Sequence, residues 1–249
     1  MTLRIRFCKY GILKFIGHLD VMRYFQKAVR RAGLDVAYSR GYSPHQLMSF
    51  ASPLGVGLTS DAEYLDVELH SCDSPEIMTE RLNAVMAEGI RVSACRILPE
   101  TPPNTRRENA MSAVAAADYL VSLKDGYQTG LENQEWKDKF RDFMAAKTIS
   151  VLKKSKSGDK ETDIRPMIYE YAFPGSDAYP DSCMERYQNG LTVFLRTAAG
   201  STQNLKPELV IEAFSESAEL SFDRFAWQIH RLQIYRRSAL TQRFEALIP

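Results

Sequence analysis

The sequence GYSPHQLMSFASPLGVG, residues 41–57, decides how the first part of the chain is interpreted. It is too long and too apolar for an ordinary hairpin turn, and too rich in Gly and Pro for a single strand. A basic predicted helix precedes it, and a strand of alternating polarity follows it. We therefore expect a long, ordered loop that shapes a site beside that helix.

The segments around this loop follow a regular order. Apolar and polar residues alternate in the predicted strands, and apolar residues recur at helical spacing in the predicted helices. The order is a strand over 3–8, a helix over 18–32, a strand over 34–39, a strand over 63–69, a helix from Ser74 to about 88 and a strand over 90–97. This order predicts a ferredoxin-like (split βαβ) domain over 1–100, with an antiparallel sheet and both helices on one face.

The Pro-rich stretch 101–111 predicts a linker, and residues 112–249 predict a second domain. The same rhythm recurs there less cleanly, with strands over 113–123, 149–153, 162–173, 191–196 and 231–236 and helices over 133–147, 206–214 and 221–229. The fold class expected is therefore α+β, with tandem ferredoxin-like domains that have antiparallel sheets, the second elaborated. Residues 174–190 carry no recognisable pattern.

Charge is distributed unevenly although the net charge is only +1. Residues 1–60 hold nine Arg and Lys against two acids, whereas residues 61–100 hold nine acids against three Arg. This asymmetry indicates either an anionic partner or an internal charge match. Cross-strand pairs of Arg4 and Arg6 with Asp66 and Glu68 would be such a match.

A stripe of cations lies on the predicted helix 18–32. Arg23, Lys27 and Arg30 fall opposite the apolar positions, so they form either a solvated face or a surface that follows a phosphate backbone. Arg40, just before the long loop, and Tyr42 and His45 within it are not needed for packing. We expect these loop residues to bind RNA or another anion together with the helix.

His18 is the candidate catalytic residue. At a helix start it could act as general base on a ribose 2′-hydroxyl, with Lys14 stabilising the developing charge. The alternative is a packed histidine, because helical periodicity puts His18 on the side of Met22, Phe25 and Val29.

A second basic patch is predicted around a turn at Ser157-Gly158-Asp159. Its residues are Lys153, Lys154, Lys156, Lys160 and Arg165. They form either a solvated hairpin tip or a second contact to nucleic acid.

Cysteine spacing and hydropathy set limits on the class of protein. The four cysteines form no C-x-x-C pair, so we expect reduced thiols, no metal site and no cofactor. No apolar run is long enough for a membrane span or a signal peptide, which favours a cytoplasmic protein.

Several motifs stand together in order: Lys14-x-x-x-Gly17-His18-Leu19-Asp20, Tyr38-Ser39-x-Gly41-Tyr42-x-Pro44, Ser49-Phe50-Ala51-x-Pro53-Leu54-x-Val56-Gly57, Glu63-Tyr64-x-Asp66, Asp163-Ile164-Arg165-Pro166 and Lys206-Pro207-Glu208. With them the chain resembles the radical SAM-linked family of unknown function. That resemblance implies a partner, a radical SAM protein of the type with a B12-binding-like region, which would hold the radical chemistry. In that family, ribonuclease E/G-type and ribosomal proteins also occur in the neighbourhood. The resemblance therefore implies RNA or a ribosome-related ribonucleoprotein as a further partner.

Three functions follow from these observations. The first is an accessory protein that binds RNA or presents a substrate to a radical SAM enzyme. The second is a metal-independent endoribonuclease that uses His18, since the start of helix 18–32 and the tandem plan are similar to CRISPR repeat-processing endoribonucleases. The third is a protein–protein adaptor that binds no nucleic acid.

Overall fold

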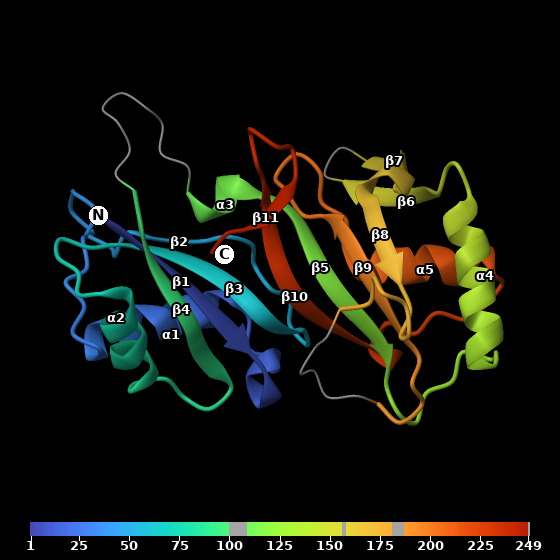
Figure 1. Cartoon of the computed structure of the whole chain (residues 1–249), viewed down its shortest axis with the longest axis horizontal. Helices are drawn as coiled ribbons and strands as arrows, with labels where there is room; N and C mark the ends of the chain where they lie inside the picture. Colours follow the sequence, from blue (N-terminus) through green and yellow to red (C-terminus); the bar gives the residue numbers. More distant parts are fainter. Residues whose placement is uncertain (100–108, 156–157, 181–186, 249) are drawn as a thin grey trace. The chain divides into compact units, whose positions relative to one another are not determined.

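The computed structural model describes residues 1–99, 109–155, 158–180 and 187–248 (Figure 1). The chain is a mixed α+β protein with a large, mostly antiparallel sheet and few helices. It divides into unit 1, which is Met1–Ala116 with Arg231–Pro249, and unit 2, which is Ala117–His230. The linker over 101–111 stays a prediction, since residues 100–108 lie outside the described residues.

Strand β1 (Thr2–Lys9) is the centre of unit 1. It pairs antiparallel with β3 (Thr59–Glu68) on one side and with β4 (Ile90–Leu98) on the other. The short β2 (Met48–Phe50) also pairs with β3. The pairing expected between the strands at 3–8 and 63–69 is therefore confirmed.

Both helices of unit 1 pack on one face of this sheet, as predicted. Leu3, Ile5 and Phe7 are at most 2% exposed and form one core with α1 (His18–Arg31) and α2 (Pro75–Asn83). Gly33 has a φ of 66° just beyond α1, and its carbonyl accepts a hydrogen bond from Arg81 of α2. This left-handed glycine ends the helix where the sequence predicted.

The strand predicted over 34–39 is wrong. Val36 and Tyr38 make only isolated bridges, to Leu69 and Gln46. The chain turns away from the sheet here to form a hairpin, and β2 inside the predicted loop takes the place beside β3.

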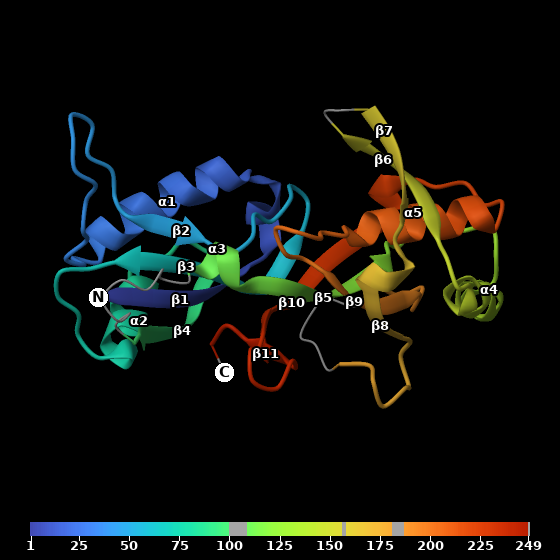
Figure 2. The same cartoon turned by 90° about the horizontal axis from the view of Figure 1, so that it is seen from above.

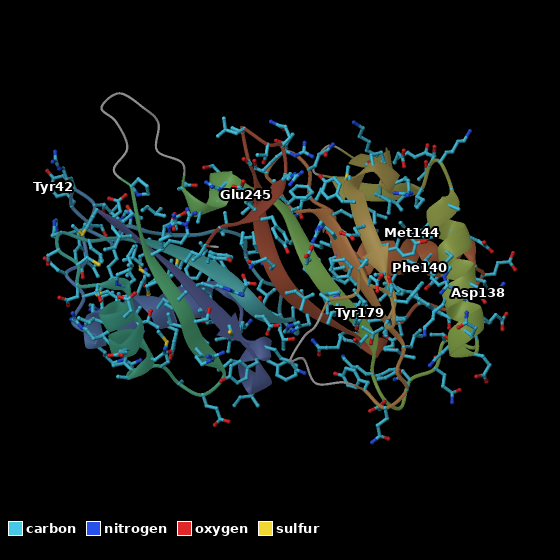
Figure 3. The ribbon with its side chains drawn as sticks, in the orientation of Figure 1. Tyr42, Asp138, Phe140, Met144, Tyr179 and Glu245 are labelled. Atoms are coloured by element: carbon cyan, nitrogen blue, oxygen red, sulfur yellow. The ribbon has the colours of Figure 1, made fainter. Side chains whose placement is uncertain are left out.

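Unit 2 is built on β5 (Val114–Leu123), which begins in unit 1, and on β8 (Ile168–Ala172) and β9 (Thr192–Ala198), which pair antiparallel. Helices α4 (Asn133–Ala145) and α5 (Pro207–Ser217) enclose an aromatic core in which Trp136 stacks on Phe140 at 5.1 Å. Figure 3 labels Phe140 and Met144 on the buried side of α4 and Asp138 on its exposed side. A separate two-stranded sheet contains β6 (Ser150–Ser155) and β7 (Gly158–Asp163).

Short elements complete the chain. They are the 3-10 turns at Gly11–Phe15, Arg165–Met167 and Arg224–Ala226, helix α3 (Ala110–Ala113), strand β10 (Trp227–Arg237) and strand β11 (Phe244–Ala246), which pairs with β10.

The helix predicted over 221–229 is wrong. The spacing of Phe222, Phe225 and Ile229 suggested a helix, but Phe225 is 67% exposed and Trp227 already belongs to β10. The first five residues of β10 are all buried, so this strand lacks the alternation that reveals strands in a sequence.

The single strand predicted over 162–173 is also wrong. It is divided into β7, a 3-10 turn at Arg165–Met167 and β8. The Asp163 carboxylate accepts hydrogen bonds from the backbone N–H groups of Ile149 and Arg165, and Pro166 has no N–H to donate to a ladder. Both features turn the chain at this point.

Candidate functional site

Helix α1 presents a cationic face to solvent. Its apolar side buries Val21, Phe25, Ala28 and Val29 against the sheet, which leaves Arg23, Lys27 and Arg30 exposed. Asp20 lies 3.6 Å from Arg23, and both side chains are more than 60% exposed, so this pair neutralises little. The face therefore keeps most of its positive charge.

The first half of the 41–57 loop is a hairpin. Tyr38 bridges Gln46, and the backbone N–H of Ser39 donates to the carbonyl of His45 at 2.8 Å. The Ser39 hydroxyl also lies 2.8 Å from Nδ1 of His45. Arg40 and Tyr42 are consequently carried on the exposed part of the hairpin, and Figure 3 shows Tyr42 projecting into solvent.

The hairpin is fastened to α1 by Gln46. This side chain is only 7% exposed, and its Nε2 donates to the backbone carbonyl of Gln26 at 3.2 Å and to the Tyr38 hydroxyl at 3.4 Å. Figure 2 shows the hairpin next to the C-terminal part of α1. This contact joins the base of the hairpin to α1. The predicted RNA-binding residues on these two elements are here called the basic surface: Arg23, Lys27, Arg30, Arg40, Tyr42 and His45.

The second half of the loop packs on the sheet. Phe50 and Leu54 are each 7% exposed, whereas Val56 is 59% exposed. The predicted loop therefore serves two purposes: its first part extends to solvent, and its second part encloses one end of the core.

His18 lies against the buried second half of the loop. Its ring meets the Phe50 ring edge-on at a centroid distance of 5.0 Å. Burial lowers the pKa of His18, and the charge of Lys9 lowers it further. The packed position expected from the helical periodicity is thus observed, with the ring half-buried.

Lys9, rather than the predicted Lys14, accompanies His18. Both His18 and Lys9 line a cavity of about 10 Å³ together with Phe50 and Glu63, whereas the Lys14 ammonium lies 5.3 Å from the centre of the Phe15 ring. A cavity of this size holds about one water molecule. An RNA substrate therefore cannot enter it in this conformation.

A buried ionic cluster, defined by Lys9, Glu63 and Arg231, adjoins this cavity. Arg231 donates to both carboxylate oxygens of Glu63, at 3.1 and 3.0 Å. Burial raises the pKa of the Glu63 carboxyl, an effect that Arg231, Ser60 and Lys9 oppose. Burial lowers the pKa of Lys9, whose ammonium donates to the carbonyl of Ile16 at 3.0 Å.

Sequence reasoning missed this cluster. Lys9 and Glu63 stand at ordinary strand positions, and Arg231 lies 168 residues from Glu63. No local pattern signals such a pair.

The expected ion pair between the first and third strands is present. Arg4 donates through two nitrogens to Asp66, at 2.8 and 2.9 Å, and the side chains are 6% and 7% exposed. Arg6, in contrast, lies opposite Tyr64, and Thr2 lies opposite Glu68, so Arg6 and Glu68 are not cross-strand neighbours.

The second basic patch is described only in part. Lys160 is exposed, and the Arg165 guanidinium donates to the carbonyls of Met144 and Ile168, at 3.1 and 3.2 Å. These contacts fix the turn before β8. The side chains of Lys153, Lys154 and Lys156 lie outside the described residues, so a nucleic-acid contact there stays a prediction.

The described residues show neither a metal-binding cluster nor a membrane-spanning helix. Among them, no three His, Cys, Asp or Glu side chains gather in a way that could hold a metal ion. None of the helices in that part of the chain is both long and apolar enough to cross a membrane.

By its fold and surface, this is a mixed α+β protein with an exposed basic surface and a buried ionic cluster. The sequence model described as "Uncharacterized protein conserved in bacteria (DUF2344)" matches residues 2–207. The chain therefore belongs to this family. A search of curated proteins gave no match.

Proposed function

We propose that this protein is an accessory protein that binds RNA through the basic surface. One observation carries the proposal: Gln46 fastens the hairpin with Arg40, Tyr42 and His45 to the helix with Arg23, Lys27 and Arg30. Cations that follow a phosphate backbone and an exposed aromatic ring that can stack on a base are the two components of single-strand binding. Four of the six side chains are cationic at neutral pH.

Fluorescence polarisation of a labelled single-stranded RNA tests this proposal. The salt concentration is varied from about 50 to 200 mM, and each lost phosphate contact makes the negative slope of log K against log salt shallower by about 0.7. Lys27→Gln/Arg30→Gln should make this slope shallower by about 1.4. Lys147→Gln/Lys206→Gln removes the same charge from exposed positions in unit 2 and should leave the slope unchanged. Equal losses in the two variants would argue against a specific surface.

We further infer that the RNA-bound protein serves a radical SAM enzyme, as its binding or substrate-presenting partner. This rests on the motifs shared with the radical SAM-linked family, of which Tyr38-Ser39-x-Gly41-Tyr42-x-Pro44 lies in the hairpin. Co-purification of the two proteins after nuclease treatment separates the possibilities. Retention of the enzyme without RNA supports the adaptor alternative, and its loss together with RNA supports the RNA-bridged one.

We also infer a tandem ferredoxin-like plan. In unit 1 the strand neighbours run β4-β1-β3, with β2 paired to β3. In unit 2 the corresponding order is β10-β5-β9-β8, with the Trp227–His230 part of β10 at its edge. The helices occupy corresponding places in the two units. In unit 1, α1 follows the first strand, β1, and α2 precedes the last, β4; in unit 2, α4 follows β5 and α5 precedes β10.

The endoribonuclease alternative has one supporting observation. His18 has a lowered pKa and is therefore neutral at pH 7, the state that a general base needs. RNA cleavage that persists in chelator and is lost in His18→Ala would support this alternative. It further requires the water-sized cavity to open.

A further inference from the structure

Unit 2 contains a groove that the proposed RNA-binding function does not use. Two cavities of about 510 and 540 Å³ share Ser150, Ala213 and Glu216 and so form one continuous depression. Its walls are the C-terminal half of α4, the start of β6 with Glu161 of β7, and one side of α5. Figure 2 shows α5 beside the β6–β7 pair.

Part of the lining of this groove is apolar. Phe143 of α4 and Leu209 of α5 are only half-buried, and Leu152 of β6 is 72% exposed. Leu152 lies opposite Glu161 across the β6–β7 ladder, so both side chains project from the same face of this hairpin. An exposed leucine beside two half-buried apolar side chains favours an apolar occupant.

The rim of the groove is acidic. Asp142, Glu161, Glu212 and Glu216 line it together with a single cation, Lys139, which gives a net charge of −3. None of these four carboxylates forms an ion pair with any residue that the structure describes. Glu212 and Glu216 lie one helical turn apart on α5, where two like charges repel each other.

We propose that this acidic groove binds a cationic amphipathic helix of a partner protein. Apolar side chains of that helix would cover Phe143, Leu152 and Leu209, and its Lys or Arg residues would meet the carboxylates at the rim. The spacing of Glu212 and Glu216, about 6 Å along α5, matches Lys or Arg residues four apart in the partner helix. The negative charge of the groove excludes a phosphate backbone. The groove and the basic surface of unit 1 would therefore bind different kinds of partner.

The test uses the full chain and two designed peptides of about 14 residues, or four helical turns. Both carry leucine at positions i, i+3, i+4 and i+7; the remaining positions are Lys and Arg in one peptide and Glu in the other. Fluorescence anisotropy should detect binding of the basic peptide and none of the acidic one. Hydrogen exchange should slow over residues 150–152 and 209–216 when the basic peptide is bound.

Two variants with the same loss of charge test the site. Glu212→Gln/Glu216→Gln should raise the Kd of the basic peptide about tenfold. Glu132→Gln/Glu135→Gln removes two exposed carboxylates at the start of α4, outside the groove, and it should change the Kd less than about twofold. Leu152→Ser should weaken binding without any change in charge.

Three results would overturn the proposal. They are no binding of the basic peptide at about 1 mM, equal weakening by both double variants, and exchange protection outside the groove. The last two would indicate attraction of a cationic peptide to acidic surfaces in general. Binding of RNA by unit 1 is measured separately, so either proposal can fail alone.

Discussion

Arg231 reaches back across 168 residues of sequence to hold both carboxylate oxygens of Glu63, at 3.1 and 3.0 Å. Both side chains are 5% exposed, so neither charge has access to bulk water. Arg231 also donates to the backbone carbonyl of Ser52 at 3.3 Å, which ties the second half of the 41–57 loop to the same pair.

Removal of Arg231 should therefore strongly destabilise the protein. Arg231→Met leaves the Glu63 carboxylate buried and should lower the free energy of unfolding by about 3–5 kcal/mol. Arg236→Met is the control, because the Arg236 side chain, which pairs with Glu245, is 47% exposed. Loss of this pair should lower the free energy of unfolding by at most about 1 kcal/mol. Urea denaturation measures both. Similar losses in the two variants would contradict a buried ionic role for Arg231.

The pKa of His18 predicts how stability depends on pH. Burial and Lys9 lower this pKa from its ordinary value of 6.5, so the folded state resists protonation. As the pH falls below about 6.5, the unfolded state binds the proton more readily and the free energy of unfolding decreases. Above that pH, His18 no longer makes the free energy of unfolding depend on pH.

His18→Gln should reduce this acid-induced loss of stability between about pH 7.5 and 5.5. His70→Gln is the matched control, because His70 is exposed. Urea denaturation at several pH values measures the slope, and NMR titration of the His18 ring measures its pKa directly. A slope unchanged by His18→Gln, or a ring pKa at or above 6.5, would refute the prediction.

Gln46 should matter more for RNA binding than for stability. In Gln46→Leu the hydrogen bond to the Gln26 carbonyl is lost, so the hairpin is no longer fastened to α1. The Oε1 atom of Gln46 is buried and has no hydrogen-bond partner among the described residues. Replacement of Gln46 by an apolar side chain of similar size should therefore change the free energy of unfolding by less than about 1 kcal/mol.

The RNA affinity of Gln46→Leu should fall about fivefold, the effect of about 1 kcal/mol of lost positioning energy. The net charge is unchanged, so the slope against salt should stay close to that of the wild type. An unaltered affinity would show that the hairpin and the helix act independently.

Two glycines with similar backbone angles should differ in their tolerance of a side chain. Gly57 and Gly89 have φ values of 87° and 94°, which disfavour an L-residue by about 1–2 kcal/mol. A Cβ at Gly57 meets no atom within 4 Å, whereas at Gly89 it would lie 2.9 Å from the Tyr10 carbonyl oxygen and from Leu13 Cγ. Gly89→Ala should therefore cost about 1–3 kcal/mol more than Gly57→Ala in thermal or urea unfolding. Equal costs would contradict this packing.

Local patterns in the sequence account for what could be predicted. Leu3, Ile5 and Phe7 alternate with polar residues because β1 of unit 1 presents one face to the helices. Gly33 marks the end of α1 because only glycine adopts that backbone angle at little cost. Such signals depend on residues within a few positions of each other.

Other parts of the structure depend on residues that are far apart, and the sequence did not reveal them. The start of β10 is buried on both faces, so no period marked Trp227 as a strand residue. Lys9 replaces Lys14 beside His18 because the chain between β1 and α1 turns through a 3-10 segment whose path has no clear sequence signature. The link between Gln46 and Gln26 uses a backbone carbonyl, which any residue supplies.

The membership of residues 231–249 in unit 1 has a consequence for biosynthesis. Residues 117–230 must be translated after the first part of unit 1 and before Arg231, which at about 5–20 residues per second takes roughly 6–23 s. During that interval Glu63 lacks the guanidinium of Arg231, and the nascent chain holds an incomplete unit 1. Ribosome-bound chains stalled before residue 231 should accordingly protect unit 1 from protease less well than chains in which residues 231–249 have left the ribosome.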